Sequence, residues 1–373
     1  MRIALAQINP TVGDVAGNAR LVLEAMEHAR RDGAQLLVTP ELCLLGYPPR
    51  DLLQREGVVE ACERAVAAIA RAAAGITVLV GHPRRCDEGA RPLRNSVSAV
   101  RDGECVGIYD KRLLPSYDVF DEDRHFSPGT APLVIEVGGR RVGILVCEDL
   151  WRADDTSVER RYGVDCAAET RAAGAEVLVV PSASPFVLGK REKHLVQVVE
   201  TARRTGCPVV SVNQVGANDD LIFDGASIAV AADGTRLAEA GSWRESMVHL
   251  DLTSGVASVA TPAGAGEPAV VDATRSTEGT SREPESAQLF KALVLGVRDY
   301  FRKTGHQRAI LGLSGGIDSA LTATIAAAAL GPANVIGLLM PSRYSSPGSI
   351  EDAKELAQRL RLGRVETIPI EPA

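Results

Sequence analysis

The chain has 373 residues, enough for two domains, and a formal net charge of −7 with an isoelectric point near 5.5. This acidic balance argues against a general binder of nucleic acid or membrane surfaces, so an anionic ligand would need local geometry to hold it. Seven cysteines without paired spacing, a start without signal-peptide features and no apolar run near roughly 20 residues predict a cytoplasmic protein.

Strands and helices alternate through the first 252 residues. Short apolar runs predict strands at residues 2–7, 35–39, 76–80, 95–100, 104–110, 142–146, 177–180, 209–212, 227–231 and 246–252. Helical periodicity predicts helices at residues 18–31, 57–74, 166–173 and 190–205. This alternation, with a hairpin around Asp102-Gly103, predicts a layered α/β domain.

The segment RRVGILVCEDLW, residues 140–151, contains the main candidate for a catalytic residue. Its short β-branched run predicts a buried strand that ends just before Cys147. A thiol at that point is held rigidly yet can be reached, as a nucleophile must be, although a lone cysteine is more often a small buried hydrophobe. Glu148 and Asp149 are hard to bury beside a structural cysteine, and they would raise the pKa of the thiol. A reactive Cys147 therefore needs a cation or a base from elsewhere in the chain.

Two other polar residues occupy the same kind of position as Cys147. Glu41 follows the strand predicted at 35–39, and Lys111 follows the strand predicted at 104–110. Strand ends along one edge of a sheet are where α/β proteins build their sites. At such an edge Glu41 can take the thiol proton, Lys111 can stabilise a developing oxyanion and Cys147 can attack a carbonyl carbon.

Three motifs carry a family resemblance. PELCLLGYPPRDLL contains Glu41, YDKRLLPSYDVFDEDRHF contains Lys111 and LVCEDLW contains Cys147. In this order they resemble the Glu, Lys and Cys motifs of the nitrilase, or carbon–nitrogen hydrolase, superfamily, and in particular the glutaminase domain of the glutamine-dependent NAD synthetase family. The resemblance covers about residues 1–252. It implies an αββα sandwich and a γ-glutamyl thioester on Cys147.

The resemblance also implies further site residues. Tyr117 in LPSYDVF, and Ser184 and Lys190 in PSASPFVLGK, map onto glutamine-binding positions. Glu122 maps onto an additional glutamate that some members use. Without the resemblance, Tyr117 would be a half-buried surface aromatic. A lysine at the start of a helix, as at Lys190, opposes the helix dipole, which favours a ligand-binding role.

A Cys–His–Glu amidotransferase is the main alternative for this region, because it also hydrolyses glutamine through a thiolate. Its histidine would have to come from His82, His125 or His194. None of them follows the end of a predicted strand, so each is expected to be structural or on the surface.

Beyond residue 252 the composition changes. Residues 253–286 are rich in Gly, Ala, Ser, Thr, Pro and Glu and have no periodic apolar face, which predicts a linker after a first domain of residues 1–252. Residues 287–373 predict a second α/β domain. Its helices are expected at residues 288–303, 320–330 and 349–360, and its strands at residues 308–313, 335–340 and 365–370.

The segment SGGIDS, between a strand and a helix of the second domain, has the arrangement that binds phosphate. Gly315 and Gly316 let backbone N–H groups approach phosphate oxygens, Ser314 and Ser319 add hydroxyl donors, and the helix dipole favours an anion. Asp318 fits such a site if a divalent metal accompanies the phosphates. The segment matches neither the Walker A loop nor the GxGxxG fingerprint.

This segment resembles the pyrophosphate loop of the ATP pyrophosphatase family, and VIGLLMPSRYSSPGSIEDAKELAQRL resembles the NAD synthetase branch of that family. The resemblance implies a partial Rossmann-like domain that binds ATP, with substrate-associated Mg²⁺ at Asp318. The implied ATP-binding residues are Gly312, Leu313, Ser314, Gly315, Gly316, Ile317, Asp318 and Ser319.

The two resemblances together imply ATP-dependent amidation of deamido-NAD to NAD, with ammonia from glutamine hydrolysed at Cys147. The implied partners are glutamine, deamido-NAD and ATP, without nucleic acid or membrane, and we expect a homo-oligomer. Few strands fit between Ser319 and Ala373, so we expect a truncated second domain and a chain that supports only the glutaminase step. Three alternatives remain: a free-standing amidase, a non-catalytic nucleotide-binding protein, and another ATP pyrophosphatase amide ligase, such as one making GMP or asparagine.

Overall fold

The computed structural model describes residues 1–151, 162–260, 269–271 and 283–371. The chain divides into two compact units, one made of Met1–Gly216 and Phe223–Thr280 and the other of Ala217–Ile222 and Ser281–Ala373. The division near residue 280 falls inside the predicted linker. In the described ranges, no helix is both long and apolar enough to cross a lipid bilayer.

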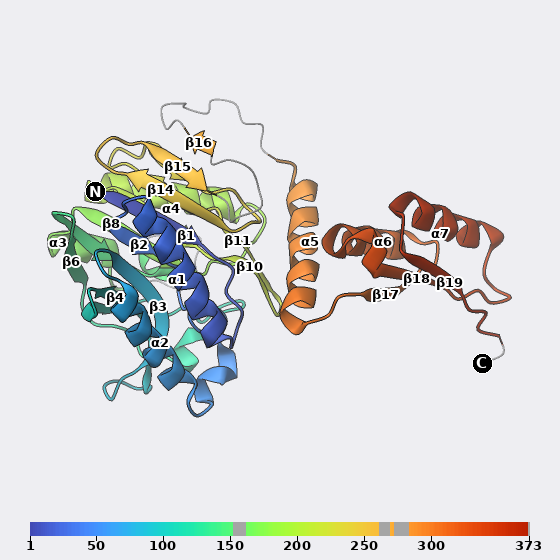
Figure 1. The fold of residues 1–373 in the computed structure, drawn as a ribbon, viewed down its shortest axis with the longest axis horizontal. Coiled ribbons are helices and arrows are strands. Elements are labelled where there is room, and N and C mark those ends of the chain that lie inside the picture. The colour runs from blue at the N-terminus through green and yellow to red at the C-terminus, as the bar shows by residue number, and fades with distance from the viewer. Residues whose placement is uncertain (152–161, 261–268, 272–282, 372–373) are drawn as a thin grey trace. The chain divides into compact units, whose positions relative to one another are not determined.

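Two β-sheets form the centre of the first unit (Figure 1). Among the described residues the larger sheet has the strand order β16-β15-β14-β1-β2-β3-β4-β5, and the smaller has the order β13-β12-β9-β8-β7-β6. The strands of the larger sheet are β1 (Arg2–Gln7), β2 (Leu36–Val38), β3 (Thr77–Arg85), β4 (Leu93–Arg101), β5 (Glu104–Asp110), β14 (Ser246–Asp251), β15 (Ala257–Ala260) and β16 (Ala269–Val271). Those of the smaller sheet are β6 (Leu133–Val137), β7 (Arg140–Ile144), β8 (Val177–Ser182), β9 (Val209–Asn213), β12 (Ile228–Val230) and β13 (Arg236–Glu239).

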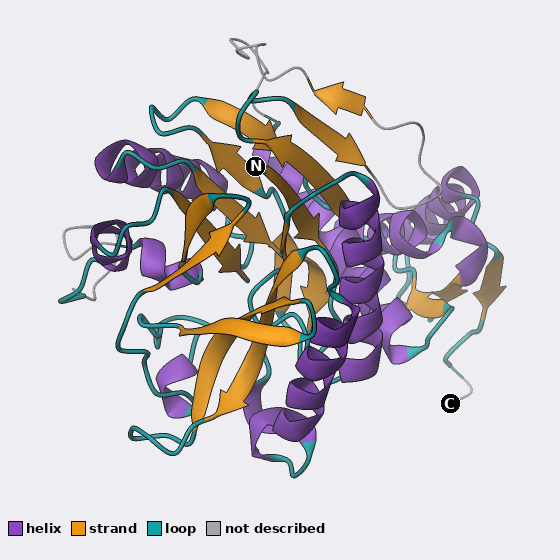
Figure 2. Ribbon diagram, turned by 60° about the vertical axis from the view of Figure 1, so that its left-hand side comes forward, coloured by secondary structure: helices purple, strands orange, loops and turns teal. Residues whose placement is uncertain are grey.

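Helices cover the outer face of each sheet (Figure 2). Helices α1 (Val15–Arg31) and α2 (Val58–Ala72) pack on the larger sheet, and α3 (Cys166–Ala172) and α4 (Lys190–Thr205) pack on the smaller one. A single apolar cluster joins the two inner faces; it includes Ile3, Leu36 and Leu79 from one sheet and Val142, Val179 and Val210 from the other. The first unit is therefore the αββα sandwich that the sequence predicts.

Parallel pairing at the middle of each sheet sets the place of the site. Strand β1 pairs in parallel with β2, and β2 with β3; in the other sheet β7 pairs in parallel with β8, and β8 with β9. These strands are buried on both faces, which is why they are continuous apolar runs in the sequence. Their carboxyl ends share one edge of each sheet, where an α/β protein places functional side chains.

Several short elements were not predicted. They are the strands β6 and β13, the two-stranded sheet of β10 (Val215–Asn218) and β11 (Leu221–Asp224), and the 3-10 helices η1 (Arg50–Gln54), η2 (Glu122–Arg124) and η3 (Cys147–Leu150). Each has three to five residues, too few to show a period. Helix α1 begins at Val15, before the predicted start, because the Asp14 side chain caps it by accepting from Gly17 N at 2.9 Å.

The prediction of an unstructured linker at residues 253–286 was wrong in part. Strand β15 pairs with β14, and β16 pairs with β15, so both extend the larger sheet. The short run ASVA at 257–260 is compatible with a strand, although Gly, Ser and Ala elsewhere in the segment conceal it. The remainder of the predicted linker, residues 261–268 and 272–282, lies outside the described residues.

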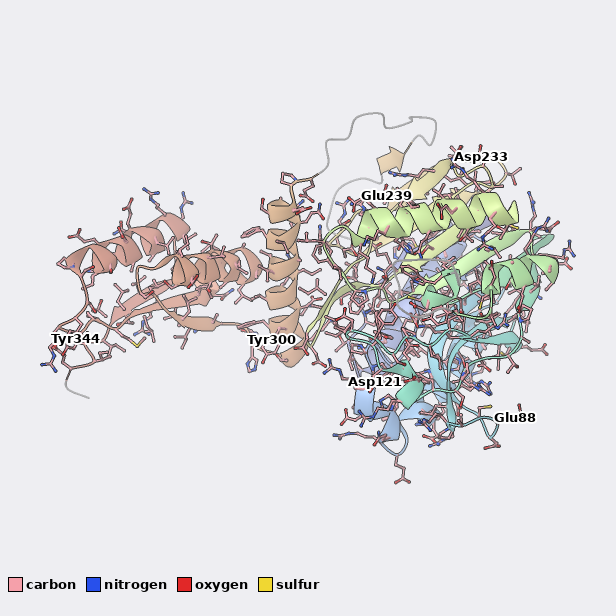
Figure 3. All side chains as sticks on the ribbon, turned by 180° about the vertical axis from the view of Figure 1, so that it is seen from behind. Glu88, Asp121, Asp233, Glu239, Tyr300 and Tyr344 are labelled. Carbon is pink, nitrogen blue, oxygen red and sulfur yellow. The ribbon has the colours of Figure 1, made fainter. Side chains whose placement is uncertain are left out.

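The second unit contains a small parallel sheet in the order β17-β18-β19. Its elements are β17 (Ala309–Gly312), β18 (Val335–Leu339), β19 (Arg364–Thr367), α5 (Glu285–Thr304), α6 (Ile317–Leu330), η4 (Pro332–Asn334) and α7 (Pro347–Leu360). Leu313 and Leu339 pack with alanines of α6 and α7 in its apolar cluster. Tyr344, labelled in Figure 3, lies after β18 and is 85% exposed.

Candidate active site

The three residues predicted from strand ends meet at one edge of the sandwich. Glu41 follows β2, Lys111 follows β5 and Cys147 follows β7. The loop that carries Glu41 rests directly on β3 at Gly81, where a Cβ atom would lie 2.4 Å from the Pro40 carbonyl oxygen and 2.5 Å from the Leu42 nitrogen. Glycine at position 81 is therefore a steric requirement for the position of Glu41.

Lys111 forms a buried ion pair with two glutamates. Its Nζ donates to Glu41 Oε1 at 2.6 Å and to Glu122 Oε1 at 2.8 Å. All three side chains are almost fully buried. Burial opposes the charge of Lys111, but the carboxylates of Glu122 and Glu41 outweigh it and raise the lysine pKa. Burial also raises the pKa of Glu122 to about 7, despite the opposing effect of Lys111.

Further donors orient the two glutamates. Asn95 Nδ2 donates to Glu41 Oε1 at 2.7 Å and lies 3.5 Å from Glu122 Oε2. The backbone N–H of Ala183 donates to Glu41 Oε2 at 3.1 Å, and the Tyr47 hydroxyl donates to Glu122 Oε1 at 2.9 Å. Glu122 thus shares the ammonium of Lys111 with Glu41, a position compatible with the additional glutamate that the family resemblance implies.

Cys147 occupies a turn with unusual backbone geometry. Its φ is +45°, a value that non-glycine residues rarely adopt, and it opens the 3-10 helix η3 directly after β7. Burial raises the pKa of its thiol; Glu41 raises it further, Lys111 and Lys190 lower it, and Glu148 raises it. The two lysines are the cations that the sequence argument required.

Glu148 and Asp149, the two carboxylates beside the cysteine, are both buried but have different partners. Asp149 accepts from the backbone N–H groups of Leu113 and Val146 and from the Tyr109 hydroxyl, so it ties η3 to the segment after β5. Glu148 instead accepts from two tyrosine hydroxyls, Tyr117 at 3.0 Å and Tyr162 at 2.7 Å. Asp149 is therefore bound into the fold, whereas Glu148 acts electrostatically on the Cys147 thiol.

Two of the predicted glutamine-binding residues lie beside Glu148. Tyr117 bonds to it, and Lys190 interacts electrostatically with both Glu148 and Cys147. The Lys190 Nζ also donates to the Pro185 carbonyl oxygen at 3.1 Å and lies 5.8 Å from the centroid of the Phe120 ring. Burial lowers the pKa of Lys190. Ser184, the third predicted residue, is fixed through its backbone by Asn213 and follows Ala183, the donor to Glu41.

Two of the three histidines of the alternative amidotransferase lie within hydrogen-bond distance of serine hydroxyls. His82 Nε2 lies 2.7 Å from the Ser98 hydroxyl, and His194 Nε2 lies 3.1 Å from the Ser211 hydroxyl. Burial lowers the pKa of both to about 4. Burial also lowers the pKa of His125, which lines the pocket described next. The charged groups that act most strongly on the Cys147 thiol are the glutamates and lysines named above.

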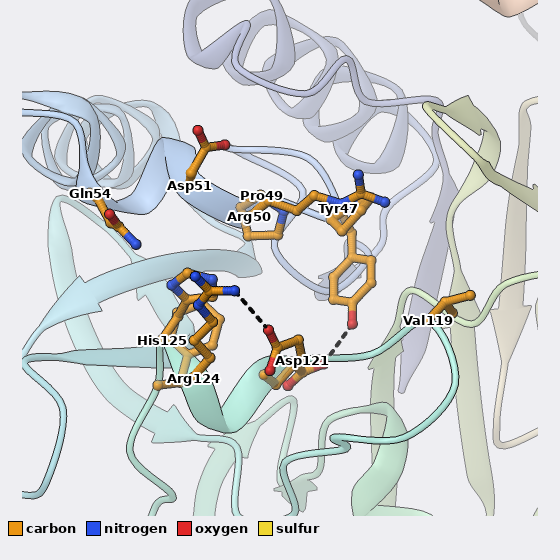
Figure 4. Close-up of a pocket in the computed structure, with 12 residues that line it drawn as sticks. Tyr47, Pro49, Arg50, Asp51, Gln54, Val119, Asp121, Arg124 and His125 are labelled. Carbon is orange, nitrogen blue, oxygen red and sulfur yellow. Dashed lines mark hydrogen bonds and ion pairs between the residues drawn. The ribbon is translucent and has the colours of Figure 1, made fainter.

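A pocket of about 300 Å³ opens next to Glu122 (Figure 4). The dashed lines in the figure mark the Tyr47–Glu122 hydrogen bond and the Arg124–Asp121 ion pair. Charged side chains of both signs surround the opening, including Arg50 and Asp51. The buried pair of Glu122 and Tyr47 is thus the inner wall of a solvent-accessible pocket.

The SGGIDS segment of the second unit connects β17 with α6. Gly315 has a φ of +80°, and a Cβ atom there would lie 2.3 Å from the Ser349 carbonyl oxygen. The Ser314 and Ser319 hydroxyl oxygens lie 3.0 Å apart, and the Gly316 N–H donates to Ser314 Oγ at 3.3 Å. The loop is therefore closed on itself at the N-terminus of a helix, the geometry that suits phosphate.

Sequence reasoning missed Asn95, Tyr47 and Tyr162 as members of the site. Asn95 begins a predicted strand at 95–100, and a polar residue at a strand end was the available signal. Tyr162 donates its hydroxyl to Glu148 and Tyr47 donates its hydroxyl to Glu122, and no local pattern marks either tyrosine.

Comparison with known families agrees with this geometry. A family model described as carbon-nitrogen hydrolase matches residues 2–260, and one described as NAD synthase matches residues 289–373. The matches cover both units, so the expectation that this chain supports only the glutaminase step is not borne out.

Relatives named glutamine-dependent NAD(+) synthetase align along nearly the whole chain. The protein from Synechocystis sp. is 41% identical over 99% of this chain and 64% of its own length, and that from Rhodobacter capsulatus is 38% identical over 99% and 62%. The chain thus spans less than two thirds of the length of these curated relatives.

Solved structures are also similar. The glutamine-dependent NAD+ synthetase from Acinetobacter baumannii in complex with ADP has a TM-score of 0.84 and 32% identity, covering 99% of this chain and 65% of its own. An amidase from Nesterenkonia sp. AN1, in which acrylamide has added to the active-site cysteine, has a TM-score of 0.59 and 28% identity over 68% of this chain and 93% of its own. Because a single family model accounts for residues 2–260, more than half of the sequence, the chain belongs to the carbon–nitrogen hydrolase family.

Proposed function

We propose that the first unit hydrolyses glutamine through a thioester on Cys147, and that the chain acts as a glutamine-dependent NAD synthetase. In that reaction the ammonia would amidate deamido-NAD with ATP as the energy source. The names of the relatives support the overall reaction, and the acrylamide adduct on the active-site cysteine of the Nesterenkonia amidase supports a nucleophilic cysteine.

The observation that carries the glutaminase proposal is a pair of opposite charges beside Cys147. Glu148 is buried and accepts from two tyrosines, and Lys190 is half-buried and acts electrostatically on the same thiol. An acidic and a basic side chain next to a nucleophile suit an amino acid with its own ammonium and carboxylate groups better than a simple amide. Glutamine meets this requirement and carries a cleavable amide.

In the acylation step, Glu41 takes the proton of Cys147 as Sγ attacks the carbonyl carbon of the glutamine amide. The Lys111 ammonium stabilises the oxyanion that forms on the carbonyl oxygen. The C–N bond then breaks, and Glu41 returns the proton to the leaving nitrogen, which departs as ammonia. A γ-glutamyl thioester is left on Cys147.

In the second step, Glu41 takes a proton from a water molecule as that water attacks the thioester carbonyl carbon. The C–S bond breaks, glutamate leaves, and the sulfur regains a proton. Glu122 shares Lys111 with Glu41 and has a pKa raised by burial to about 7, so it can hold a proton while Glu41 acts as the base. Two carboxylates at one ammonium can thus have different protonation states near neutral pH.

The residues of the second unit fit an ATP phosphate site. Backbone N–H groups at the start of the fourteen-residue helix α6 and the hydroxyls of Ser314 and Ser319 supply donors. Asp318 lies in the first turn of α6 and is exposed, so its carboxylate can contact a Mg²⁺ ion that arrives with the phosphates. All eight predicted ATP-binding residues, 312–319, lie in this strand–loop–helix segment.

Two broader expectations belong to the same proposal. All seven cysteines are free, which supports a reducing, cytoplasmic setting. The homo-oligomer expected from the family resemblance stays a prediction.

A direct assay tests the glutaminase step. The chain should release ammonia and glutamate from glutamine, and Cys147→Ala should reduce this release to the background rate, a loss of roughly four orders of magnitude or more. Cys105→Ala, at an exposed thiol, should change nothing. A wild-type chain that prefers propionamide over glutamine would favour the free-standing amidase instead, and retained turnover in Cys147→Ala would refute both.

A further inference from the structure

Asn95 lies between the two glutamates of the site. It is near the start of β4, which runs antiparallel to both β3 and β5, so this end of β4 lies at the carboxyl edge of its neighbours. The side chain is 1% exposed. An amide so deeply buried needs hydrogen-bond partners, and here the partners are the reacting groups themselves.

Asn95 is bonded to all three charged members of the Lys111 cluster. Its Nδ2 donates to Glu41 Oε1 at 2.7 Å and approaches Glu122 Oε2 at 3.5 Å. Its backbone oxygen accepts from Lys111 N at 2.8 Å, which fixes the start of the segment that carries the ammonium. The amide nitrogen faces the glutamates because, in the reverse orientation, the amide oxygen would face the carboxylate of Glu41.

The two oxygens of Glu41 have unequal partners. Oε1 accepts from Lys111 Nζ and from Asn95 Nδ2, so two short bonds occupy its lone pairs. Among the described residues, Oε2 accepts the longer bond from the backbone N–H of Ala183, at 3.1 Å. Oε2 is thus the oxygen with the greater capacity to accept a proton.

We propose that Asn95 is a positioning residue that holds Glu41 with Oε1 occupied, so that Oε2 is the atom that takes the proton of Cys147. This inference rests on the proposed cysteine chemistry. The amide supplies a donor to ionised Glu41 without adding a charge to a cluster that already contains Lys111, Glu122, Cys147 and the Tyr47 hydroxyl. A carboxylate in its place would repel Glu41, and an alanine would leave Oε1 short of a donor.

Asn95→Ala and Asn95→Asp test the proposal. In Asn95→Ala, kcat for glutamine should fall by roughly 10- to 100-fold while KM changes less than about threefold, because the glutamine contacts remain. The acid limb of its pH profile should move to higher pH, since the carboxylates bonded to Lys111 have lost a donor that stabilises their ionised form. Asn95→Asp should keep more activity at the acid end, where its carboxyl is protonated and can donate, than at the alkaline end.

Asn18→Ala is the matched control. Asn18 is also 1% exposed, and its Nδ2 donates to the backbone oxygens of Thr11 and Leu44, away from the charged cluster. Its loss should reduce thermal stability without moving the acid limb. If Asn95→Ala and Asn18→Ala show the same pH profile as the wild type, Asn95 is only structural and the proposal is wrong.

The rate at which iodoacetamide alkylates Cys147, followed by mass spectrometry across pH 5–9, separates this inference from the proposed function. A wild-type chain that does not hydrolyse glutamine would refute the proposed function, yet alkylation would still report proton transfer from the thiol. A shifted acid limb of alkylation in Asn95→Ala supports the role of Asn95, and an unshifted limb overturns it. If Asn95→Ala does not fold, the nearly isosteric Asn95→Asp replaces it in the test. Its rate of Cys147 alkylation should fall further below the wild-type rate at alkaline pH than at acid pH.

Discussion

The cluster around Lys111 and the SGGIDS loop are both built at strand ends, but they hold their polar groups in different ways. In the cluster, a lysine and two glutamates are buried and bonded to one another. In the loop, the serine hydroxyls bond to each other at the surface, and Ile317 at the start of α6 is 81% exposed.

The two arrangements differ in how a substitution at the site affects the stability of the fold. A buried ion pair costs desolvation, and removing one partner leaves an uncompensated charge, so the first site couples chemistry to stability. The loop keeps its backbone N–H groups at a helix N-terminus near solvent, so it can gain phosphate contacts at little cost to the fold. Substitutions should therefore act on turnover and stability together in the cluster, but mainly on ligand binding in the loop.

The largest effect should come from Lys111→Met, which keeps the volume of the side chain and removes its charge. Glutamine turnover should fall by roughly two to four orders of magnitude, because the oxyanion loses its cation. Urea unfolding should show a loss of about 3–5 kcal/mol, because Glu41 and Glu122 are left buried without their ammonium.

The control is Lys193→Met, at an exposed lysine on α4. It should leave turnover and stability within experimental error of the wild type. A Lys111→Met variant with normal turnover, together with a large loss in His82→Ala or His194→Ala, would favour the Cys–His alternative over the lysine cluster.

The site was predictable from sequence to the extent that it follows strand ends. Glu41, Lys111 and Cys147 each come just after a predicted strand, and the packing of the two sheets brings the ends of β2, β5 and β7 to one site. Glu148 was noted as a carboxylate that is hard to bury, but its two tyrosine donors come from positions 117 and 162, which the local sequence does not connect. Hydrogen bonds across such separations depend on tertiary packing.

The secondary structure was likewise predictable where a sequence pattern is long and local. Long periodic segments such as α4, predicted at 190–205, were found at those residues. Short strands such as β6 and β13 have too few residues for alternation to stand out. In the predicted linker, β15 becomes a strand by pairing with β14, and β16 by pairing with β15, interactions that composition alone does not reveal.

The loop offers the intermediate effect. Asp318→Asn keeps the shape of the side chain and removes its charge, so binding of ATP in the presence of Mg²⁺ should weaken by roughly 10- to 100-fold in calorimetric titration of the full chain. The melting temperature should change by no more than about one degree, because the side chain is exposed.

Asp352→Asn, at an exposed aspartate of α7, serves as the control and should bind ATP as the wild type does. A large loss of stability in Asp318→Asn would contradict the contrast between the two sites, since it would show that the loop also depends on a fixed internal charge. Unchanged binding would remove Asp318 from the ATP site.

The last effect concerns the pH dependence of stability, and it tests the cluster without measuring turnover. Burial raises the pKa of Glu122 from its ordinary 4.5 to about 7, so the folded state binds this proton more tightly than the unfolded chain does. The resulting stabilisation is fully present below pH 4.5 and is lost as pH rises through about 7, a change of the order of 2–3 kcal/mol. Glu122→Gln cannot titrate, so its urea unfolding free energy should fall less between pH 5 and pH 8 than that of the wild type. The control Glu104→Gln, at an exposed glutamate, should show the same dependence of unfolding free energy on pH as the wild type. If the curve of Glu122→Gln is also parallel to the wild-type curve, Glu122 stays ionised beside Lys111 throughout this range.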